Sequence, residues 1–160
     1  MSQKGPHRRL TPYWHFLTSV ADTISIKRRS ENMRKIRSIG TKPERDVCRI
    51  IRAMDFRFRR HSSGLPGKPD IVFPRAKKII DVRGCFWHQH KGCIDSHIPK
   101  SKVGYWRAKL RRNVRRDARN LRELKKLGWR VLVVWECQVS SSKMQLLQSR
   151  LKRFLIRASV

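Results

Sequence analysis

The chain has 160 residues, which suits one domain with its own core, and it carries 40 Lys plus Arg against 11 Asp plus Glu, a formal net charge of +29. This imbalance predicts a polyanionic partner, and DNA is favoured because its counterions are released when basic side chains neutralise phosphates, so salt should weaken binding steeply. A membrane partner is disfavoured, because no basic block adjoins a long apolar run or lipidation motif, and the segment 13–20 is too short to span a bilayer.

The N-terminal part of the chain is basic and weakly patterned. Residues 1–20 show no sustained period and are interpreted as an extension of unknown role, ahead of a single domain over 21–160. Between 30 and 39, basic side chains accompany Met33 and Ile36, a composition that suggests a short helix or arm lying on DNA.

Residues 41–54 have the pattern of a helix. Thr41 can act as the N-cap, Pro43 stands in the first turn, and Glu44 follows the cap by three residues, as in a capping box. Apolar residues then recur with helical spacing at Val47, Ile50, Ile51 and Met54. Cys48 lies within this stripe and is interpreted as a small buried hydrophobic residue.

The remainder of the chain is predicted to alternate strands with helices. Apolar runs punctuated by Gly and Pro place strands near 56–60 and over 71–73, 78–82 and 129–135, and helical periodicity places helices over 101–127 and 140–156. The last strand is expected to be buried, and Val114 and Leu146 are expected on the buried faces of the two helices. The predicted fold class is α/β, with a central mixed β-sheet flanked by helices.

A loop with the sequence GCFWHQHKGC, at 84–93, concentrates metal-ligand side chains. Cys85, His90 and Cys93 lie within nine residues, and Cys137 follows in VVWEC; thiols and imidazole are the ligands that tetrahedral zinc prefers. Because four protein ligands leave no open position, the predicted zinc is structural and joins the loop after one strand to the end of another. The alternative is a disulfide between two of the four cysteines, although no secretory segment is visible and the histidine stands at a ligand spacing.

Several further segments, in order, resemble the very-short-patch repair (Vsr) DNA mismatch endonucleases. Besides GCFWH and VWEC, they are RSENMRKIRS at 29–38, TKPE at 41–44, LPGKPD at 65–70, YWRAKLRRNVRRD at 105–117 and LGWRVLVVWEC at 127–137. The resemblance implies a restriction-endonuclease-like core and a Mg²⁺-dependent, strand-specific nick in duplex DNA at T:G mismatches, which arise when 5-methylcytosine deaminates. It also implies a monomeric enzyme of the bacterial cytoplasm, associated with the nucleoid, with mismatch-repair accessory proteins as further partners.

Two acidic positions have the layout of the restriction-enzyme-like core, Asp70 before one strand and Asp81 near the end of the next. Carboxylate oxygens near one phosphate could hold a magnesium ion that polarises the phosphoryl group and lowers the pKa of its bound water. The resemblance makes Asp70 and the backbone carbonyl of Val82 magnesium ligands, and Asp81 could add another. It makes Glu44 an acidic neighbour of the metal, although a capping box alone accounts for Glu44 and a turn or cap alone for Asp70.

Arg83 and His88 are the remaining catalytic candidates. The family usually carries His two positions before the first zinc cysteine, where this chain has Arg83, and an apolar residue at the position of Asp81. Arg83 could stabilise the pentavalent phosphate but could not act as a general base; alternatively, the substitution disables the site. Imidazole is suited to proton transfer near neutral pH, and the resemblance implies that His88 transfers protons; the alternative is a partner or ligand of the zinc.

Aromatic and polar side chains complete the expected DNA interface. The resemblance implies that Phe86, Trp87 and Trp106 intercalate beside the mispaired thymine, where a weakened pair lowers the cost of unstacking. It also places Met33 near the mismatch, and Asn113 could contact bases from the long basic helix. Trp106 could instead be the first core position of that helix.

Two other functions fit the same residues. A non-catalytic binder of mismatched or distorted DNA is suggested by Arg83 and by the large positive charge. A restriction-type nuclease without mismatch preference is suggested by the acid, spacer and base of DVR at 81–83. The fate of a T:G duplex incubated with Mg²⁺ discriminates among the three functions.

Overall fold

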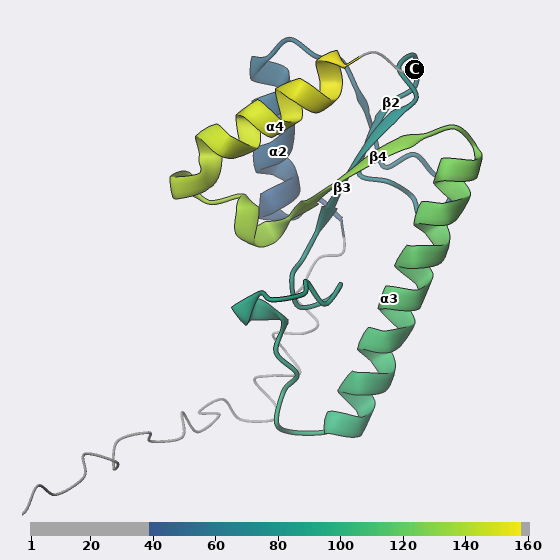
Figure 1. Ribbon diagram of the computed structural model, residues 1–160, viewed down its shortest axis with the longest axis vertical. Coiled ribbons are helices and arrows are strands. Elements are labelled where there is room, and N and C mark those ends of the chain that lie inside the picture. Colours follow the sequence, from purple (N-terminus) through teal and green to yellow (C-terminus); the bar gives the residue numbers. More distant parts are fainter. Residues whose placement is uncertain (1–38, 158–160) are drawn as a thin grey trace, which may run out of the picture. The chain divides into compact units, whose positions relative to one another are not determined.

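A computed structural model describes residues 39–157 of the chain (Figure 1). Its elements are, in chain order, α2 (Lys42–Ala53), β1 (Arg59–Arg60), β2 (Ile71–Phe73), β3 (Lys78–Arg83), α3 (Val103–Lys126), β4 (Arg130–Trp135) and α4 (Met144–Ile156), with short 3-10 helices at Ile94–Ser96, Glu136–Gln138 and Ser141–Lys143. The predictions for the extension over 1–20 and for Met33 fall outside the described residues. Within 39–157, no helix is both long and apolar enough to cross a membrane.

The four strands form one mixed sheet in the spatial order β1-β2-β3-β4. The first three strands pair antiparallel, whereas β4 runs parallel to β3 with Val134 opposite Val82. The predicted central mixed sheet is therefore confirmed. The prediction of a fully buried strand over 129–135 is wrong, because β4 is an edge strand and Val134 is the one buried residue among its six.

Helix α2 begins with the predicted capping arrangement. The Thr41 side-chain oxygen accepts the Glu44 backbone N–H at 3.4 Å, and Pro43 lies in the first turn. In return, the buried Glu44 carboxylate accepts hydrogen bonds from the Gly40 backbone N–H and the Thr41 hydroxyl, both at 2.8 Å. The cap therefore starts the helix and also fixes the Glu44 side chain.

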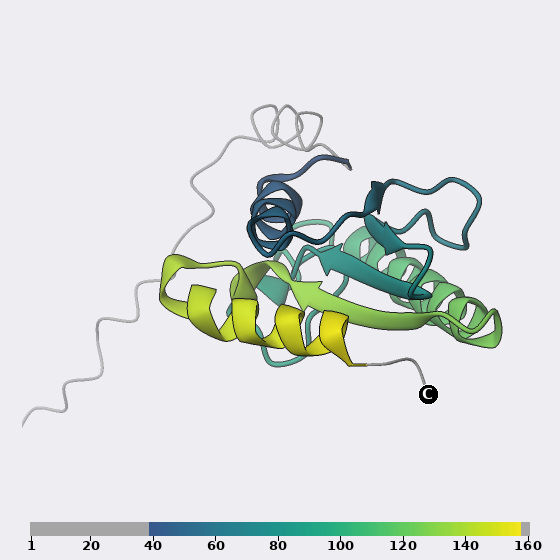
Figure 2. The same cartoon turned by 90° about the horizontal axis from the view of Figure 1, so that it is seen from above.

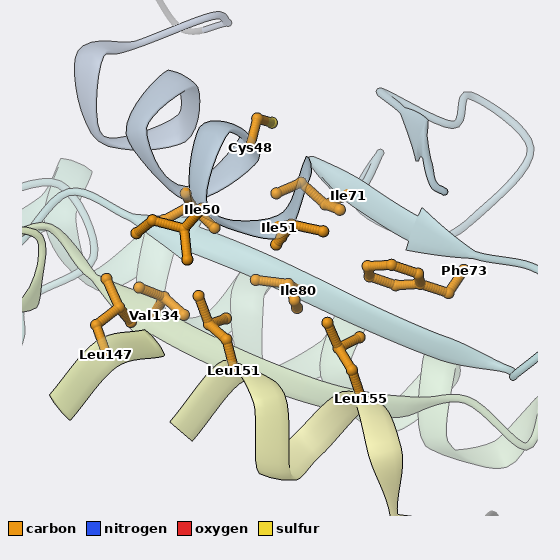
Figure 3. Packing of buried hydrophobic residues seen from close by; sticks show 11 residues of the cluster. Cys48, Ile50, Ile51, Ile71, Phe73, Ile80, Val134, Leu147, Leu151 and Leu155 are labelled. Carbon is orange, nitrogen blue, oxygen red and sulfur yellow. The ribbon is translucent and has the colours of Figure 1, made fainter. Parts of the chain in front are cut away.

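Helices α2 and α4 cover one face of the sheet, and α3 covers the other (Figures 1 and 2). Neighbouring residues of β3 pack on opposite faces of the sheet. Ile80 packs with α2 and α4, whereas Ile79 packs with Leu124 of α3 and with Trp129. The larger cluster, drawn in Figure 3, contains Val47, Cys48, Ile50, Ile51, Ile71, Phe73, Ile80, Val134, Leu147, Leu151 and Leu155. Cys48 is a buried core residue, as predicted.

Two apolar side chains expected on buried helix faces are exposed instead. Val114 is 41% exposed and Leu146 is 72% exposed. The 24-residue α3 is about 36 Å long, whereas a six-residue strand spans about 20 Å, so the first half of α3, which includes Val114, extends beyond the sheet. In the first turn of α4, Leu147 takes the buried position beside Leu146.

Lys78, the first residue of β3, is buried and ties this strand to α4. Its ammonium group donates to the backbone carbonyl of Leu155 at 2.7 Å and to that of Arg157 at 2.6 Å. These carbonyls lie at the C-terminus of α4, where helix geometry leaves no backbone N–H for the last turn. Burial lowers the pKa of Lys78. The start of β3 is therefore anchored to the C-terminal end of α4.

Candidate functional site

Cys85, His90, Cys93 and Cys137 converge on one point. Each offers a ligand atom, and these atoms all lie within 4.8 Å of one another. His90 Nδ1 is 3.6 Å from Cys85 Sγ and 3.3 Å from Cys137 Sγ. All four cysteines of the chain are free thiols, so the disulfide alternative is wrong. Three thiols and one imidazole form a donor set that suits a closed tetrahedral zinc site.

Parallel strand pairing brings this cluster together. Cys85 follows the end of β3 and Cys137 follows the end of β4, and parallel neighbours end at the same edge of a sheet. The His90 ring stacks on Trp135, the last residue of β4, with centroids 4.1 Å apart. Burial raises the pKa of the Cys85 thiol to about 12, so a thiolate at this position requires a nearby cation.

A second cluster forms where Asp70 enters β2. Asp70 Oδ2 accepts the backbone N–H of Val82 at 2.8 Å, which fixes the carboxylate against β3. Burial, and then the nearby Asp81 and Glu44 carboxylates, raise the pKa of Asp70 to about 7. Glu44, 26 positions earlier in the chain, reaches the same place from the first turn of α2. The side chain of His61 reaches it from the residue after β1. A divalent cation would offset the repulsion between these carboxylates.

His61 is a residue that the sequence pattern did not single out. Its Nε2 lies 4.0 Å from Glu44 Oε2, and its backbone N–H donates to the Asp70 carbonyl at 3.1 Å. Tertiary packing of α2 with the strands β1 and β2 brings these residues together, and an isolated histidine in a basic segment carries no local signal of such a contact.

Asp81 and Arg83 form an ion pair along β3. Both Nε and Nη2 of Arg83 contact Asp81 Oδ2, at 2.8 and 2.7 Å. Residues two apart on a strand lie on the same face, which explains why this pair forms within one strand. Within the described residues, the cluster of candidate cation ligands contains Glu44, His61 and Asp70 but not Asp81. The assignment of Asp81 to magnesium stays a prediction, and its observed partner is Arg83.

His88 is held by an acid that the sequence analysis missed. Its Nδ1 lies 2.5 Å from Oδ2 of Asp117, a buried residue of α3. Burial alone would raise the pKa of Asp117, but the hydrogen bond and charge of His88, followed by Arg116 and Arg83, hold that pKa below its usual range. An ionised Asp117 accepts the Nδ1 proton and leaves Nε2 free to exchange a proton. The one available signal was that Asp117 is the sole acid in the first 20 residues of this basic helix.

Phe86, Trp87 and Trp106 pack as one aromatic cluster. Ring centroids are 5.0 Å apart for Phe86 and Trp87, and 5.4 Å apart for Phe86 and Trp106. Trp106 is buried, while the two loop aromatics are half-buried, and Lys109 Nζ lies 5.2 Å from the Trp87 ring centroid. The Asn113 amide donates to the Trp87 carbonyl at 3.1 Å. Asn113 therefore supports the aromatic loop, and its expected base contact stays a prediction.

Comparison with known proteins decides the family. A family model described as DNA mismatch endonuclease Vsr matches residues 21–94. The type II nicking enzyme V.XorIIP of Xanthomonas oryzae pv. oryzae is 42% identical over 136 residues, which cover 85% of this chain and 98% of that protein. The DNA mismatch endonuclease Vsr of Escherichia coli is 38% identical over 118 residues, with 74% and 75% covered. This chain belongs to the Vsr family. It is a DNA endonuclease.

Membership of the Vsr family accounts for the basic surface of α3. An open hollow on this helix is lined by Arg112, Asn113, Arg115, Arg116, Ala118, Arg119 and Arg122. Guanidinium groups bind phosphate oxygens without reading base sequence, so the composition of this surface suits a nucleic-acid backbone. The nuclease fold that the Vsr family implies agrees with the four-stranded mixed sheet and its flanking helices.

Proposed function

We propose that this Vsr-family endonuclease uses Mg²⁺ to nick one strand of duplex DNA at T:G mismatches, as in the repair of deaminated 5-methylcytosine. One observation carries the proposal, namely that separate reactive groups meet at the end of β3. The Val82 N–H binds the Asp70 carboxylate there, and five residues after the end of β3 the chain reaches His88, which pairs with Asp117. A cation site and a proton-transfer pair thus adjoin the same strand.

The proposed cofactors are two different metals. Asp70 and Glu44 would hold Mg²⁺ together with the Val82 carbonyl, and the ion would polarise the scissile phosphate and acidify its water ligand. Hard carboxylate oxygens fit this ion. The thiol-rich cluster of Cys85, His90, Cys93 and Cys137 fits one structural Zn²⁺ instead.

The proposed chemistry of the chain's own groups follows from their contacts. His88 exchanges a proton at Nε2, while Asp117 fixes the imidazole tautomer and stabilises the imidazolium form. Arg83 remains charged throughout and stabilises the negative charge that develops on the phosphate. Asp81 holds the Arg83 guanidinium by two contacts, so this group is fixed in orientation at the position where the family usually has His.

Mismatch preference is assigned to the aromatic cluster. Phe86 and Trp87 lie on the loop between two proposed zinc ligands and retain exposed surface beside the basic helix α3. Insertion of such rings between base steps costs a few kcal/mol of stacking energy, and a mispaired step reduces that cost. The Trp106 ring packs against both of these rings, with centroids 5.4 Å from Phe86 and 6.1 Å from Trp87.

A nicking assay tests the proposed function. Labelled duplexes that differ only in a T:G, T:A or C:G pair are incubated with an excess of protein and Mg²⁺, with and without EDTA. We expect a nick in one strand of the T:G duplex, at least about tenfold faster than in matched duplexes, because about 1.4 kcal/mol of unstacking cost suffices for that ratio. Equal cutting of all duplexes supports the restriction-type nuclease, and a retarded complex without any nick supports the non-catalytic binder suggested by Arg83.

Asp117→Asn is expected to slow nicking of the T:G duplex by about a hundredfold, the usual contribution of a positioned proton-transfer group. The variant loses the charge that fixes His88 in its reactive tautomer. Single-turnover rates at saturating protein measure the effect separately from DNA affinity.

Glu123→Gln is the matched control, since it removes one acidic charge from the same helix at an exposed pair with Arg119. Because His88 and Asp117 act as a unit, the double variant with His88→Asn should be no slower than His88→Asn alone. Equal rates for Asp117→Asn and Glu123→Gln would remove Asp117 from this role.

A further inference from the structure

His61 stands beside the two carboxylates to which the proposed function assigns the catalytic cation. One ligand atom from each of His61, Glu44 and Asp70 lies within 4.8 Å of the other two. Glu44 is 3% exposed, and the His61 side chain is 28% exposed, so the cluster is sheltered yet open to solvent at the histidine. The three residues come from α2, from the residue after β1 and from the residue before β2.

The separations suit shared coordination of one ion. Two ligands that each lie about 2.1 Å from an ion are at most about 4.2 Å apart. The 4.0 Å between His61 Nε2 and Glu44 Oε2 already meets this limit. The other separations lie within 4.8 Å, so they exceed this limit by about 0.6 Å at most, which a small side-chain rotation removes.

The hydrogen bonds of His61 leave the required lone pair on Nε2. Arg60 Nη2 lies 3.1 Å from this nitrogen, and a guanidinium group can only donate, so Nε2 is the acceptor. Arg60 is exposed, and its side chain can turn toward solvent or a DNA phosphate when a cation takes its place. The acceptor nitrogen therefore faces a positive group now and can face a metal ion instead.

The backbone at His61 is held in an uncommon conformation. Its φ of +49° lies in the left-handed region, which is unfavourable for a residue with a Cβ atom. The hydrogen bond from the His61 N–H to the Asp70 carbonyl, at 3.1 Å, couples this conformation to the residue that carries the carboxylate. Conformations of this kind persist where surrounding contacts fix them, and they concentrate at functional sites.

We propose that His61 is a third side-chain ligand of the active-site cation, through Nε2, in addition to Asp70, Glu44 and the Val82 carbonyl. The proposal rests on the proposed function, because it concerns the same cation. A nitrogen ligand changes the selectivity of the site, since imidazole suits first-row transition ions whereas Mg²⁺ prefers oxygen ligands alone. The site should therefore bind Mn²⁺ more tightly than Mg²⁺, and this preference should depend on His61.

The test is Mn²⁺ binding to the full-length, zinc-loaded protein. The electron paramagnetic resonance signal of free Mn²⁺ gives the affinity, and electron spin-echo modulation by ¹⁴N reports imidazole bound directly to Mn²⁺. The variants are His61→Gln, Asp70→Asn and, as a matched control, His97→Gln. His97 is exposed and its ring contacts the Ile94 carbonyl, away from the carboxylates. Circular dichroism checks that each variant is folded.

His61→Gln should weaken Mn²⁺ binding at least about tenfold. Removal of a residue that only hydrogen-bonds to a metal ligand already costs about that much affinity, and removal of a ligand should cost no less. The substitution should also abolish the ¹⁴N modulation and lower the ratio of nicking rates in Mn²⁺ and Mg²⁺, whereas His97→Gln changes none of these. If Asp70→Asn loses Mn²⁺ while His61→Gln keeps both affinity and modulation, the histidine is not a ligand and the proposed nuclease function stands. If the wild-type protein binds no Mn²⁺ and cuts without divalent ions, both proposals fail.

Discussion

Asp70→Asn is expected to abolish nicking while leaving duplex affinity intact. Loss of the cation removes several kcal/mol of transition-state stabilisation, which corresponds to a rate loss on the order of a thousandfold or more. Affinity for the duplex should persist, because it comes from the basic surface of α3 and not from Asp70. Single-turnover nicking and gel retardation of the same T:G duplex measure the two quantities.

The same substitution should stabilise the metal-free protein. The Asp70 carboxyl has a pKa of about 7 in the folded protein and an ordinary value of 3.8, so the fold disfavours its charged form. Well below the ordinary pKa of 3.8, the carboxyl is protonated in both states and costs nothing; the cost grows as the pH rises from there toward 7, and above pH 7 it is fully present, at up to about 4 kcal/mol. Asn accepts the Val82 N–H without a charge. The Tm of Asp70→Asn should therefore exceed that of the wild type at pH 8 and approach it near pH 4.

Binding of the cation should follow the same titration. Below pH 7 a proton occupies Asp70 and competes with Mg²⁺, so affinity should fall by up to about tenfold for each unit of acidification. Retained cutting by Asp70→Asn, or an unchanged Tm at pH 8, would contradict the assignment. A loss of both cutting and thermal stability would indicate misfolding rather than a lost ligand.

Cys137→Ala is expected to release zinc and to remove most of the stability of the fold. Structural zinc sites contribute about 10–16 kcal/mol of binding free energy in small zinc domains, which is comparable to the whole stability of a domain this size. Without the ion, the buried Cys85 thiol and its neighbours would lose the partner that connects the ends of β3 and β4. Metal content by mass spectrometry and thermal unfolding measure the result.

Cys48→Ala is the matched control. Cys48 is a buried thiol of the main core, outside the zinc cluster, so its truncation should cost about 1 kcal/mol and keep one zinc per chain. Wild-type protein freed of zinc by a strong chelator should resemble Cys137→Ala. A zinc-free wild type with an unchanged Tm would show that the cluster is not a structural metal site.

Local patterns were sufficient to predict most of the elements. The capping box at Thr41 and Glu44 fixed the start of α2, and the turn after Phe73 separated two strands whose apolar runs were unambiguous. The exposed positions of Val114 and Leu146 could not be predicted, because periodicity shows which face of a helix is apolar but not how far the sheet beneath it extends.

The candidate site was predictable only where its residues are close in sequence. The spacing of Cys85, His90 and Cys93 predicted a group of metal-ligand side chains, and the fold brings their ligand atoms together with that of Cys137. By contrast, the pairing of His88 with Asp117 depends on the packing of α3 against the loop, 29 residues away in the chain. The approach of His61 to Glu44 depends on β1 and α2 together, and no short motif encodes such a contact.

The aromatic loop lies between two fixed points. Cys85 and His90 belong to the same cluster, so the four residues between them, including Phe86 and Trp87, form a short closed segment. A short closed segment has few conformations to lose, and association then costs little additional entropy for the rings. Loss of a thiol from the cluster should consequently make DNA binding slower and less selective, even though the thiols lie outside the DNA interface proposed for Phe86 and Trp87.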